Sequence, residues 1–254
     1  MLLAGKRALV FGVANDHSIA WGIARALHRE GASLAFAYGA PNLERRVQPL
    51  AEQVGAKLVV ACDVSRDDDI ERAFAAVAAS WSSIDILVHA IAFAQREDLK
   101  NPFIETSRAG FQVALDISAY SLVALSRAAA PLMPAGGAIL TLSYFGAEKV
   151  LPNYNVMGVA KAALESSVRY LAWDLGARDV RINAISAGPI RTLSSAGVSG
   201  FKDMLRHHAE RAPLRKNVDL DDVGDAAVYL CSDLSRGVTG EVLHVDAGYN
   251  IVGM

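Results

Sequence analysis

The sequence predicts a single-domain α/β protein in which seven parallel strands form a doubly wound sheet with helices on both faces. Short runs that are apolar throughout alternate with longer amphipathic stretches, a pattern typical of strands buried on both faces of a parallel sheet. The chain has 254 residues, of which 52% are apolar, enough for one large core. The sequence contains no internal repeat or linker, so we expect one domain over residues 1–254.

The predicted strands are short apolar runs, and the predicted helices between them carry apolar residues on one face. The first strand is Ala8–Phe11, and Gly31 ends the helix that follows it. The predicted strands are residues 8–11, 33–38, 57–62, 85–91, 138–142, 180–185 and 241–245. The predicted helices are residues 19–30, 43–54, 67–80, 106–133, 154–176 and 222–233.

One segment, residues 192–216, breaks this alternation between the sixth strand and the last helix. It has a start rich in Ser and Gly, an amphipathic piece around Phe201 to His208, and Pro213. Long loops at the carboxyl edge of a sheet often cover ligands. We therefore expect this segment to cover a substrate.

Charge and cysteine content exclude several classes of protein. A net charge of −2 and a pI near 6.3 give no reason to expect a nucleic-acid partner. Cys62 and Cys231 lie far apart without metal or redox spacing and fit a reducing compartment.

The start of the chain is too weakly apolar for a signal peptide, and no apolar run reaches the roughly 18 residues of a membrane span. The sequence predicts a cytoplasmic protein with no membrane association and no metal.

The turn after the first strand has the residues of a phosphate-binding site. Gly12 permits a tight turn, Ser18 can cap the next helix and donate to a pyrophosphate oxygen, and Gly22 would allow close helix–sheet packing. The common GxGxxG fingerprint is absent, so an ordinary strand–helix turn with a Ser cap is the alternative. The combination predicts a Rossmann-type, dinucleotide-binding domain.

Two other strand ends supply candidate cofactor contacts. Asp63 and Val64 follow the third strand, where a carboxylate could accept a hydrogen bond from an adenine amino group. The alternative for Asp63 is the N-cap of the next helix. Residues 91–94 follow the fourth strand with small side chains where the backbone could pass close to a ribose, and plain packing is the alternative.

Tyr154 and Lys161 are the strongest candidates for chemistry. If residues 154–175 are helical, their separation is about two turns, which leaves both side chains on one face about 10 Å apart along the axis. A phenol and an ammonium on one face suit proton donation and charge stabilisation at a reacting oxygen. The alternative for this pair alone is an ordinary helix face.

The chain resembles the short-chain dehydrogenase/reductase superfamily and, within it, the bacterial enoyl-acyl-carrier-protein reductases of fatty-acid synthesis. The resemblance covers almost the whole chain. The motifs that carry it are Gly12-x5-Ser18-Ile-Ala-x-Gly22, residues 140–144 (LTLSY), 152–157 (PNYNVM), 183–192 (NAISAGPIRT) and 240–248 (GEVLHVDAG).

The chain departs from the superfamily members that reduce ketones or oxidise alcohols. Their pattern is a Ser, about twelve residues, and then Tyr-x3-Lys. Counting back from Lys161 places Met157 at the Tyr position and Tyr144 at the Ser position. There are two alternatives to an enoyl reductase. One is a carbonyl or alcohol oxidoreductase, and the other is a nucleotide-binding regulator without catalysis.

The resemblance implies roles for the remaining residues. In a 2-enoyl thioester, hydride adds to C3 and charge develops on the thioester oxygen, so a donor moved to position 154 suits that oxygen. The resemblance implies that Tyr154 binds the enolate, that Lys161 holds the nicotinamide ribose and that Tyr144 lines the pocket. The expected cofactor contacts are Gly12, Ser18, Ile19, Asp63, Val64, Ile91, Lys161, Ile190 and Thr192. The expected substrate contacts are Ala94, Tyr144, Tyr154, Met157, Phe201 and Met204, with an apolar lining from Leu193, Val198 and Leu205.

The end of the second strand bears on the choice of cofactor. Tyr38 and Gly39 offer neither an acidic residue nor a cation, and Arg45 and Arg46 lie further on. The residues alone leave NADH and NADPH open. Because the resembling enzymes mostly use NADH, we expect NADH.

The resemblance also implies two partners. Acyl carrier protein carries the enoyl thioester, and its acidic surface could meet the cations of residues 202–211. The helices at 106–133 and 154–176 have more than one apolar face, and the family forms tetramers through such helices and the final strand. We expect a homotetramer. The residues that could contact the carrier protein are Lys202, Arg206, Arg211, His207 and His208, with Asp203 and Glu210 between them and Ser199 before them.

Overall fold

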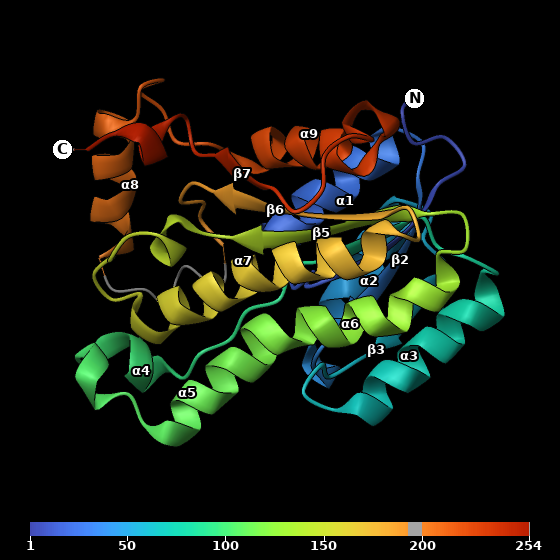
Figure 1. The fold of residues 1–254 in the computed structure, drawn as a ribbon, viewed down its shortest axis with the longest axis horizontal. Coiled ribbons are helices and arrows are strands. Elements are labelled where there is room, and N and C mark those ends of the chain that lie inside the picture. Colours follow the sequence, from blue (N-terminus) through green and yellow to red (C-terminus); the bar gives the residue numbers. More distant parts are fainter. Residues whose placement is uncertain (193–199, 254) are drawn as a thin grey trace.

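The computed structural model describes residues 1–192 and 200–253. Seven strands form one sheet in the order β3-β2-β1-β4-β5-β6-β7, and every pairing is parallel. This confirms the predicted fold class (Figure 1). The strands are β1 Arg7–Phe11, β2 Ser33–Tyr38, β3 Leu58–Ala61, β4 Ile86–His89, β5 Gly137–Ser143, β6 Val180–Ala187 and β7 Val242–Val245.

The central strand β1 is apolar from Ala8 to Phe11 because both of its faces are buried. In β1, Ala8 and Val10 enter the core on one side of the sheet, and Leu9 and Phe11 enter the core on the other. None of the four is more than 1% exposed. Successive side chains of a strand point to opposite faces, so a strand between two helical layers directs its side chains into a core on each side.

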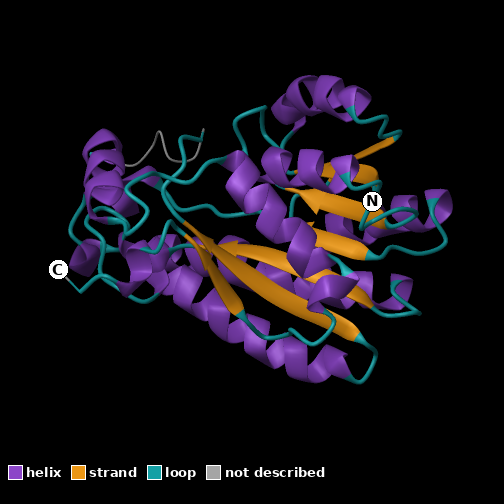
Figure 2. Ribbon diagram, turned by 90° about the horizontal axis from the view of Figure 1, so that it is seen from above, coloured by secondary structure: helices purple, strands orange, loops and turns teal. Residues whose placement is uncertain are grey.

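The helices form a layer on each face of the sheet (Figure 2). Helices α1, α2 and α9 pack on one face, and α3, α6 and α7 pack on the other. Two short or amphipathic helices, α4 and α8, lie near the carboxyl end of the sheet, so much of the predicted loop 192–216 is helical. The helices are α1 Ile19–Arg29, α2 Glu44–Gln53, α3 Asp67–Ser80, α4 Arg96–Lys100, α5 Arg108–Leu115, α6 Ser121–Ala129, α7 Asn155–Gly176, α8 Phe201–Arg211 and α9 Leu220–Cys231.

The predicted helix 106–133 is interrupted near its centre. A π-helical turn, Asp116–Tyr120, separates α5 from α6. Within this turn the Ser118 hydroxyl accepts from the amide of Phe93 at 2.9 Å and donates to the Phe93 carbonyl at 3.0 Å. The turn thereby fixes the loop that follows β4, which is a common use of π-helical turns at functional sites.

The same helical run is long and apolar enough to cross a membrane by length and composition. It spans Arg108–Leu132 with a mean hydropathy of 1.3, and 56% of its most apolar window is buried inside the protein. The core helix of a soluble protein passes the same test, so this run is weak evidence for a membrane span.

Gly22 has a different role from the predicted one. A Cβ at Gly22 would lie 2.8 Å from the Cβ and 2.9 Å from the carbonyl oxygen of Leu220, and one at Gly224 would lie 3.0 Å from the Gly22 carbonyl oxygen. The two glycines therefore permit close packing of α1 on α9. The expectation that Gly22 packs a helix on the sheet was wrong, because Gly22 faces the neighbouring helix α9 in the same layer.

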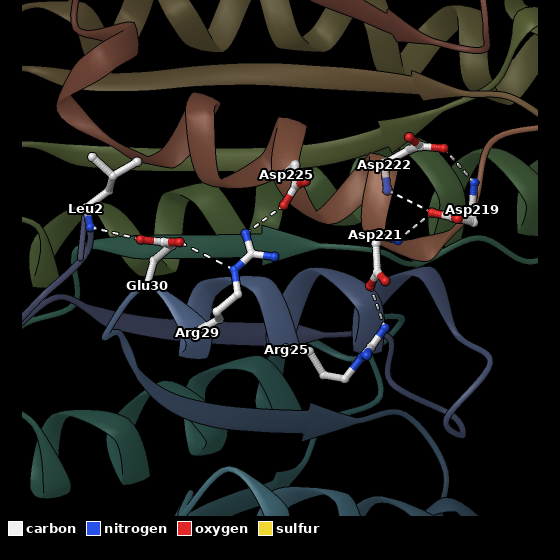
Figure 3. A network of polar contacts seen from close by, with 8 residues as sticks. All are labelled: Leu2, Arg25, Arg29, Glu30, Asp219, Asp221, Asp222 and Asp225. Atoms are coloured by element: carbon white, nitrogen blue, oxygen red, sulfur yellow. Dashed lines mark hydrogen bonds and ion pairs between the residues drawn. The ribbon is translucent and has the colours of Figure 1, made fainter.

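Two ion pairs extend the contact between α1 and α9 at its exposed edge (Figure 3). Arg25 bonds Asp221 at 2.8 Å and Arg29 bonds Asp225 at 2.6 Å. The two arginines are one helical turn apart on α1, and their two aspartate partners are one turn apart on α9, so the pairs form side by side along the two helices. Such exposed pairs contribute roughly 0.2–1 kcal/mol each.

Candidate active site

A pocket of about 480 Å³ opens at the carboxyl end of the sheet. It lies beyond β1 and β4, where the strand order reverses and where doubly wound sheets bind ligands. Apart from the apolar lining predicted at Leu193, Val198 and Leu205, every predicted site residue except Asp63 and Val64 lies in its wall. The predicted residues in its wall are Gly12, Ser18, Ile19, Ile91, Ala94, Tyr144, Tyr154, Met157, Lys161, Ile190, Thr192, Phe201 and Met204.

The turn after β1 makes a close approach to the end of β4. Gly12 has φ +99°, in the region that favours glycine, and a Cβ there would collide with the backbone carbonyl of Ala90. This close approach brings the N-terminus of α1 beside the loop after β4. The first turn of α1 contains no acidic residue, so its amide groups and dipole are free to favour an anion.

Ser18 organises this turn and does not cap α1 with its side chain. Its hydroxyl oxygen accepts from the amides of Ala14 and Asn15, both at 3.0 Å, and its proton points to Asn15 Oδ1 at 3.2 Å. The predicted side-chain cap was wrong, because the preceding loop folds back over the hydroxyl. The hydroxyl is committed within the turn, while the residue still lies in the wall of the pocket.

Asp63 and Val64 lie apart from the pocket, after β3. Asp63 Oδ1 accepts from the amide and hydroxyl of Ser65 at 3.0 and 2.7 Å, which closes a local turn. Helix α3 begins later and has Arg66 at its N-cap, so the alternative that Asp63 caps it was wrong. A contact of either residue with adenine stays a prediction.

Tyr154 is the residue before α7 and not its first helical residue. Asn153 and Asn155 on either side of it have φ of +64° and +43°, and the helix begins at Asn155. The prediction that both residues lie within one helix was therefore wrong for Tyr154, whereas Lys161 lies in α7 as predicted. The Tyr154 ring lies directly over Gly146, where any Cβ would collide with it.

The two tyrosines contact each other and reach α8. The rings of Tyr144 and Tyr154 lie edge to face, with centroids 5.0 Å apart and planes at 74°. The Tyr144 hydroxyl donates to the sulfur of Met204 at 3.1 Å. Burial raises the pKa of both phenols above the ordinary value, so both remain protonated donors near neutral pH.

Lys161 is buried at the base of the pocket, with 5% of its surface exposed. Its Nζ donates to the Leu142 carbonyl at 2.7 Å. Burial lowers the pKa of Lys161 to about 8, and the carboxylate of Glu165 opposes that change. The ammonium therefore remains largely protonated near pH 7.

Two polar groups behind the pocket were not singled out from the sequence. Glu165, one turn after Lys161, accepts from the Ser143 hydroxyl at 2.5 Å, and burial raises its pKa. His89 is fully buried, with its ring nitrogens 2.8 Å from the hydroxyls of Thr141 and Ser121. Burial lowers the pKa of His89 to about 3, so it is neutral. A histidine within the apolar strand run 85–91 was the sequence signal that could have identified His89 as a buried polar residue.

Part of the predicted substrate segment does not line this pocket. Leu205 is buried on α8 and faces a neighbouring groove. Leu193, Val198 and Ser199 lie outside the described residues. Phe201 and Met204 are in the pocket wall as predicted.

One of the cations expected to face the carrier protein is instead internal. His208 is 4% exposed and stacks on Tyr249, with ring centroids 4.6 Å apart. The expectation that His208 faces a partner was wrong, because the C-terminal segment packs over it. Lys202, Arg206 and Arg211 are exposed on α8, and Arg206 pairs with Asp203 at 2.9 Å.

Known proteins are similar to this chain over most or all of its length. A family model described as enoyl-(acyl carrier protein) reductase matches residues 12–250. The enoyl-acyl-carrier-protein reductase (NADH) FabI of Aquifex aeolicus is 56% identical over 254 residues, covering 100% of this chain and 94% of that protein.

Two solved structures are also similar. The enoyl-(acyl-carrier-protein) reductase of Anaplasma phagocytophilum, in complex with NAD, has a TM-score of 0.97 at 53% identity, covering 100% of this chain and 97% of that one. The Bacillus cereus enoyl-acyl carrier protein reductase, solved with NADP+ and indole naphthyridinone, has a TM-score of 0.98 at 55% identity, covering 100% and 99%.

Proposed function

The chain belongs to the enoyl-(acyl carrier protein) reductase family, and from that premise we propose which of its residues carry out the reaction. The protein is an NADH-dependent enoyl-acyl-carrier-protein reductase of fatty-acid biosynthesis, which reduces the trans-2 double bond of enoyl thioesters. Family membership favours this activity over the carbonyl oxidoreductase and the regulator without catalysis.

The pocket residues fit a dinucleotide. The same pocket wall contains the N-terminus of α1, which suits a pyrophosphate, and the ammonium of Lys161, which suits ribose hydroxyls. When bound, NADH supplies the hydride that adds to C3 of the enoyl thioester. The residues proposed to hold it are Gly12, Ser18, Ile19, Ile91, Lys161, Ile190 and Thr192, with Asp63 and Val64 at the adenine.

Tyr154 stabilises the charge that develops on the thioester oxygen. Its phenol is protonated because burial raises its pKa, and it lies in the same pocket as Lys161. A donor of this kind contributes most when it is already in place before charge appears. The observation that carries the assignment is that Tyr154 and Lys161 share one pocket while Met157 occupies the position of the carbonyl-reducing Tyr.

The residues proposed to form the wall for the acyl group are Tyr144, Met157, Phe201, Met204 and Ala94. Tyr144 supports Tyr154 through the edge-to-face ring contact, and its bond to Met204 links that contact to α8. The exclusion of water by this apolar wall strengthens the hydrogen bond from Tyr154 to the developing oxyanion.

We further propose that the enzyme is a cytoplasmic homotetramer that meets its carrier protein at α8. Tyr170 and Trp173 are 74% and 84% exposed on α7, and such an apolar surface on a helix favours a partner subunit. Lys202 and Arg211 are exposed on α8 and offer positive charge to an acidic carrier protein, whereas Arg206 is paired with Asp203.

The assignment is tested by following cofactor absorbance at 340 nm. Crotonyl thioester should cause oxidation of NADH, whereas a panel of ketones and a mixture without substrate should not. Oxidation of NADH with ketones but not with crotonyl thioester would contradict the proposed roles of Tyr154 and Met157.

A further inference from the structure

The active-site pocket has an uneven distribution of charge. Among the described residues in its wall, the only ionisable side chains with a formal charge are Lys161 and Arg96, and residues 193–199 of the sequence carry none. Lys161 lies buried at the base, whereas Arg96 is exposed at the rim. A wall with two cations and no carboxylate is suited to a ligand that carries negative charge.

Arg96 has no carboxylate partner within the described parts of the chain. No ion pair of the structure includes it. The nearest buried carboxylate in sequence, Asp98, faces Gly110 of α5. The guanidinium is therefore available to a ligand at the mouth of the pocket.

The position of α4 places Arg96 beside residues proposed to contact the substrate. The Asn155 side chain donates to the carbonyl groups of Asp98 at 3.2 Å and Asn101 at 2.8 Å. These bonds hold α4 against the start of α7 (Figure 1), and Tyr154 is the residue directly before that helix.

The substrate brings a negative charge to this end. The acyl group reaches the enzyme as a thioester on a phosphopantetheine arm, and that arm has a phosphate at the end remote from the sulfur. If the acyl carbon chain packs on Phe201 and Met204 and the thioester oxygen lies at Tyr154, the arm leaves the pocket over its rim. An Arg fork matches phosphate oxygens in a bidentate manner.

We propose that Arg96 binds the phosphate of the pantetheine arm and thereby makes the enzyme select phosphorylated thioesters. This inference rests on the proposed function, because it needs the thioester to be the substrate. Arg96 acts on binding and not on the reacting atoms, so its removal should change KM more than kcat.

The test compares three crotonyl thioesters with saturating NADH: the one on acyl carrier protein, the one on free 4′-phosphopantetheine, and the one on pantetheine without phosphate. The enzymes are the natural protein, Arg96→Met, and the control Lys100→Met. Lys100 is exposed at the end of the same helix but is outside the pocket wall, so it controls for a general loss of positive charge.

The natural protein should prefer the phosphopantetheine thioester to the pantetheine thioester in kcat/KM. Arg96→Met should reduce that ratio about three- to tenfold, as expected for a partly exposed charge-assisted contact. Lys100→Met should keep the ratio. A circular-dichroism melting curve and NADH affinity of each variant establish that it is folded.

Several results would overturn the proposal. An unchanged ratio in Arg96→Met, or an equal change in Lys100→Met, would show that Arg96 does not read the phosphate. A loss confined to the carrier-protein thioester would assign Arg96 to a protein carboxylate instead. If the natural protein reduces no thioester, the proposed function fails, and calorimetric titration with the two small thioesters still decides whether Arg96 discriminates between them.

Discussion

The Nζ of Lys161 donates a 2.7 Å hydrogen bond to the backbone carbonyl of Leu142, which joins the first turns of α7 to the end of β5. An ammonium has three donors, so this bond holds the group in place and leaves two donors to face the pocket. Ser143 and Tyr144 follow Leu142 directly. The cation, the supporting Tyr144 and the tyrosine proposed for catalysis are thus positioned by one strand end.

Tyr154→Phe should lower kcat by about 10²- to 10³-fold, because it removes a preorganised donor to the developing oxyanion. Cofactor affinity should change little, since the ring and its contact with Tyr144 are kept. Steady-state kinetics and fluorescence titration with NADH measure the two effects. A variant with natural turnover would show that another group stabilises the enolate.

Lys161→Ala should weaken NADH binding as well as turnover, because the proposed ribose contact is made before chemistry. Loss of a charge-assisted hydrogen bond predicts roughly a tenfold or greater rise in Kd. Unchanged affinity for NADH in a folded Lys161→Ala protein would contradict the assigned role.

Activity should fall as the pH rises through about 8, where burial places the pKa of Lys161. Below that pH the ammonium is charged and above it the amine is neutral, so the active form is lost on the alkaline side. The carboxylate of Glu165 raises the pKa of Lys161. Glu165→Gln should therefore move the alkaline limb of kcat/KM to lower pH, and a limb that stayed in place or moved upward would disprove the coupling.

NADH should be the better cofactor, because the end of β2 offers no cation to a 2′-phosphate. Arg45 and Arg46 do not lie at the strand end; they are exposed on α2. A comparison of NADH with NADPH is informative because a similar enzyme, from Bacillus cereus, was solved with NADP+. The measurement is kcat/KM with each cofactor at saturating crotonyl thioester, and a value with NADPH at or above that with NADH would refute the prediction.

Phe201→Ala should raise KM for long enoyl chains more than for crotonyl thioester, because only a long chain extends along α8. Removal of a large aromatic contact predicts a difference of roughly tenfold between long and short substrates. Phe111→Ala, a partly exposed phenylalanine outside the pocket wall, serves as the matched control. An equal rise in KM for both chain lengths would remove Phe201 from the acyl site.

The protein should be a tetramer at micromolar concentration, with Tyr170 and Trp173 covered by a neighbouring subunit. Trp173→Glu should shift the mass measured by light scattering towards smaller species, because the charge would be buried in the interface. Arg45→Glu on α2 should leave the mass unchanged. A monomeric mass for the natural protein would exclude the assembly.

The sequence predicted well those features that depend on local pattern. Strands such as β1 and β2 were recognisable because both faces are buried, which leaves no polar position in them. The pair Tyr154 and Lys161 was recognisable by type and spacing. Two local details failed for a physical reason: Ser18 bonds the folded-back loop instead of α1, and Tyr154 precedes α7 because Asn153 and Asn155 adopt positive φ.

The sequence by itself determined the α/β class, the strand and helix order and the chemical identity of the active-site groups, since each follows from residue type and periodicity. Only the tertiary structure decided which surfaces meet. It placed Gly22 against α9, buried His208 under Tyr249, joined Glu165 to Ser143, and brought Arg96 to the mouth of the pocket. Those relationships join residues far apart in the chain, so no local pattern encodes them, and the packing of whole helices on the sheet fixes them.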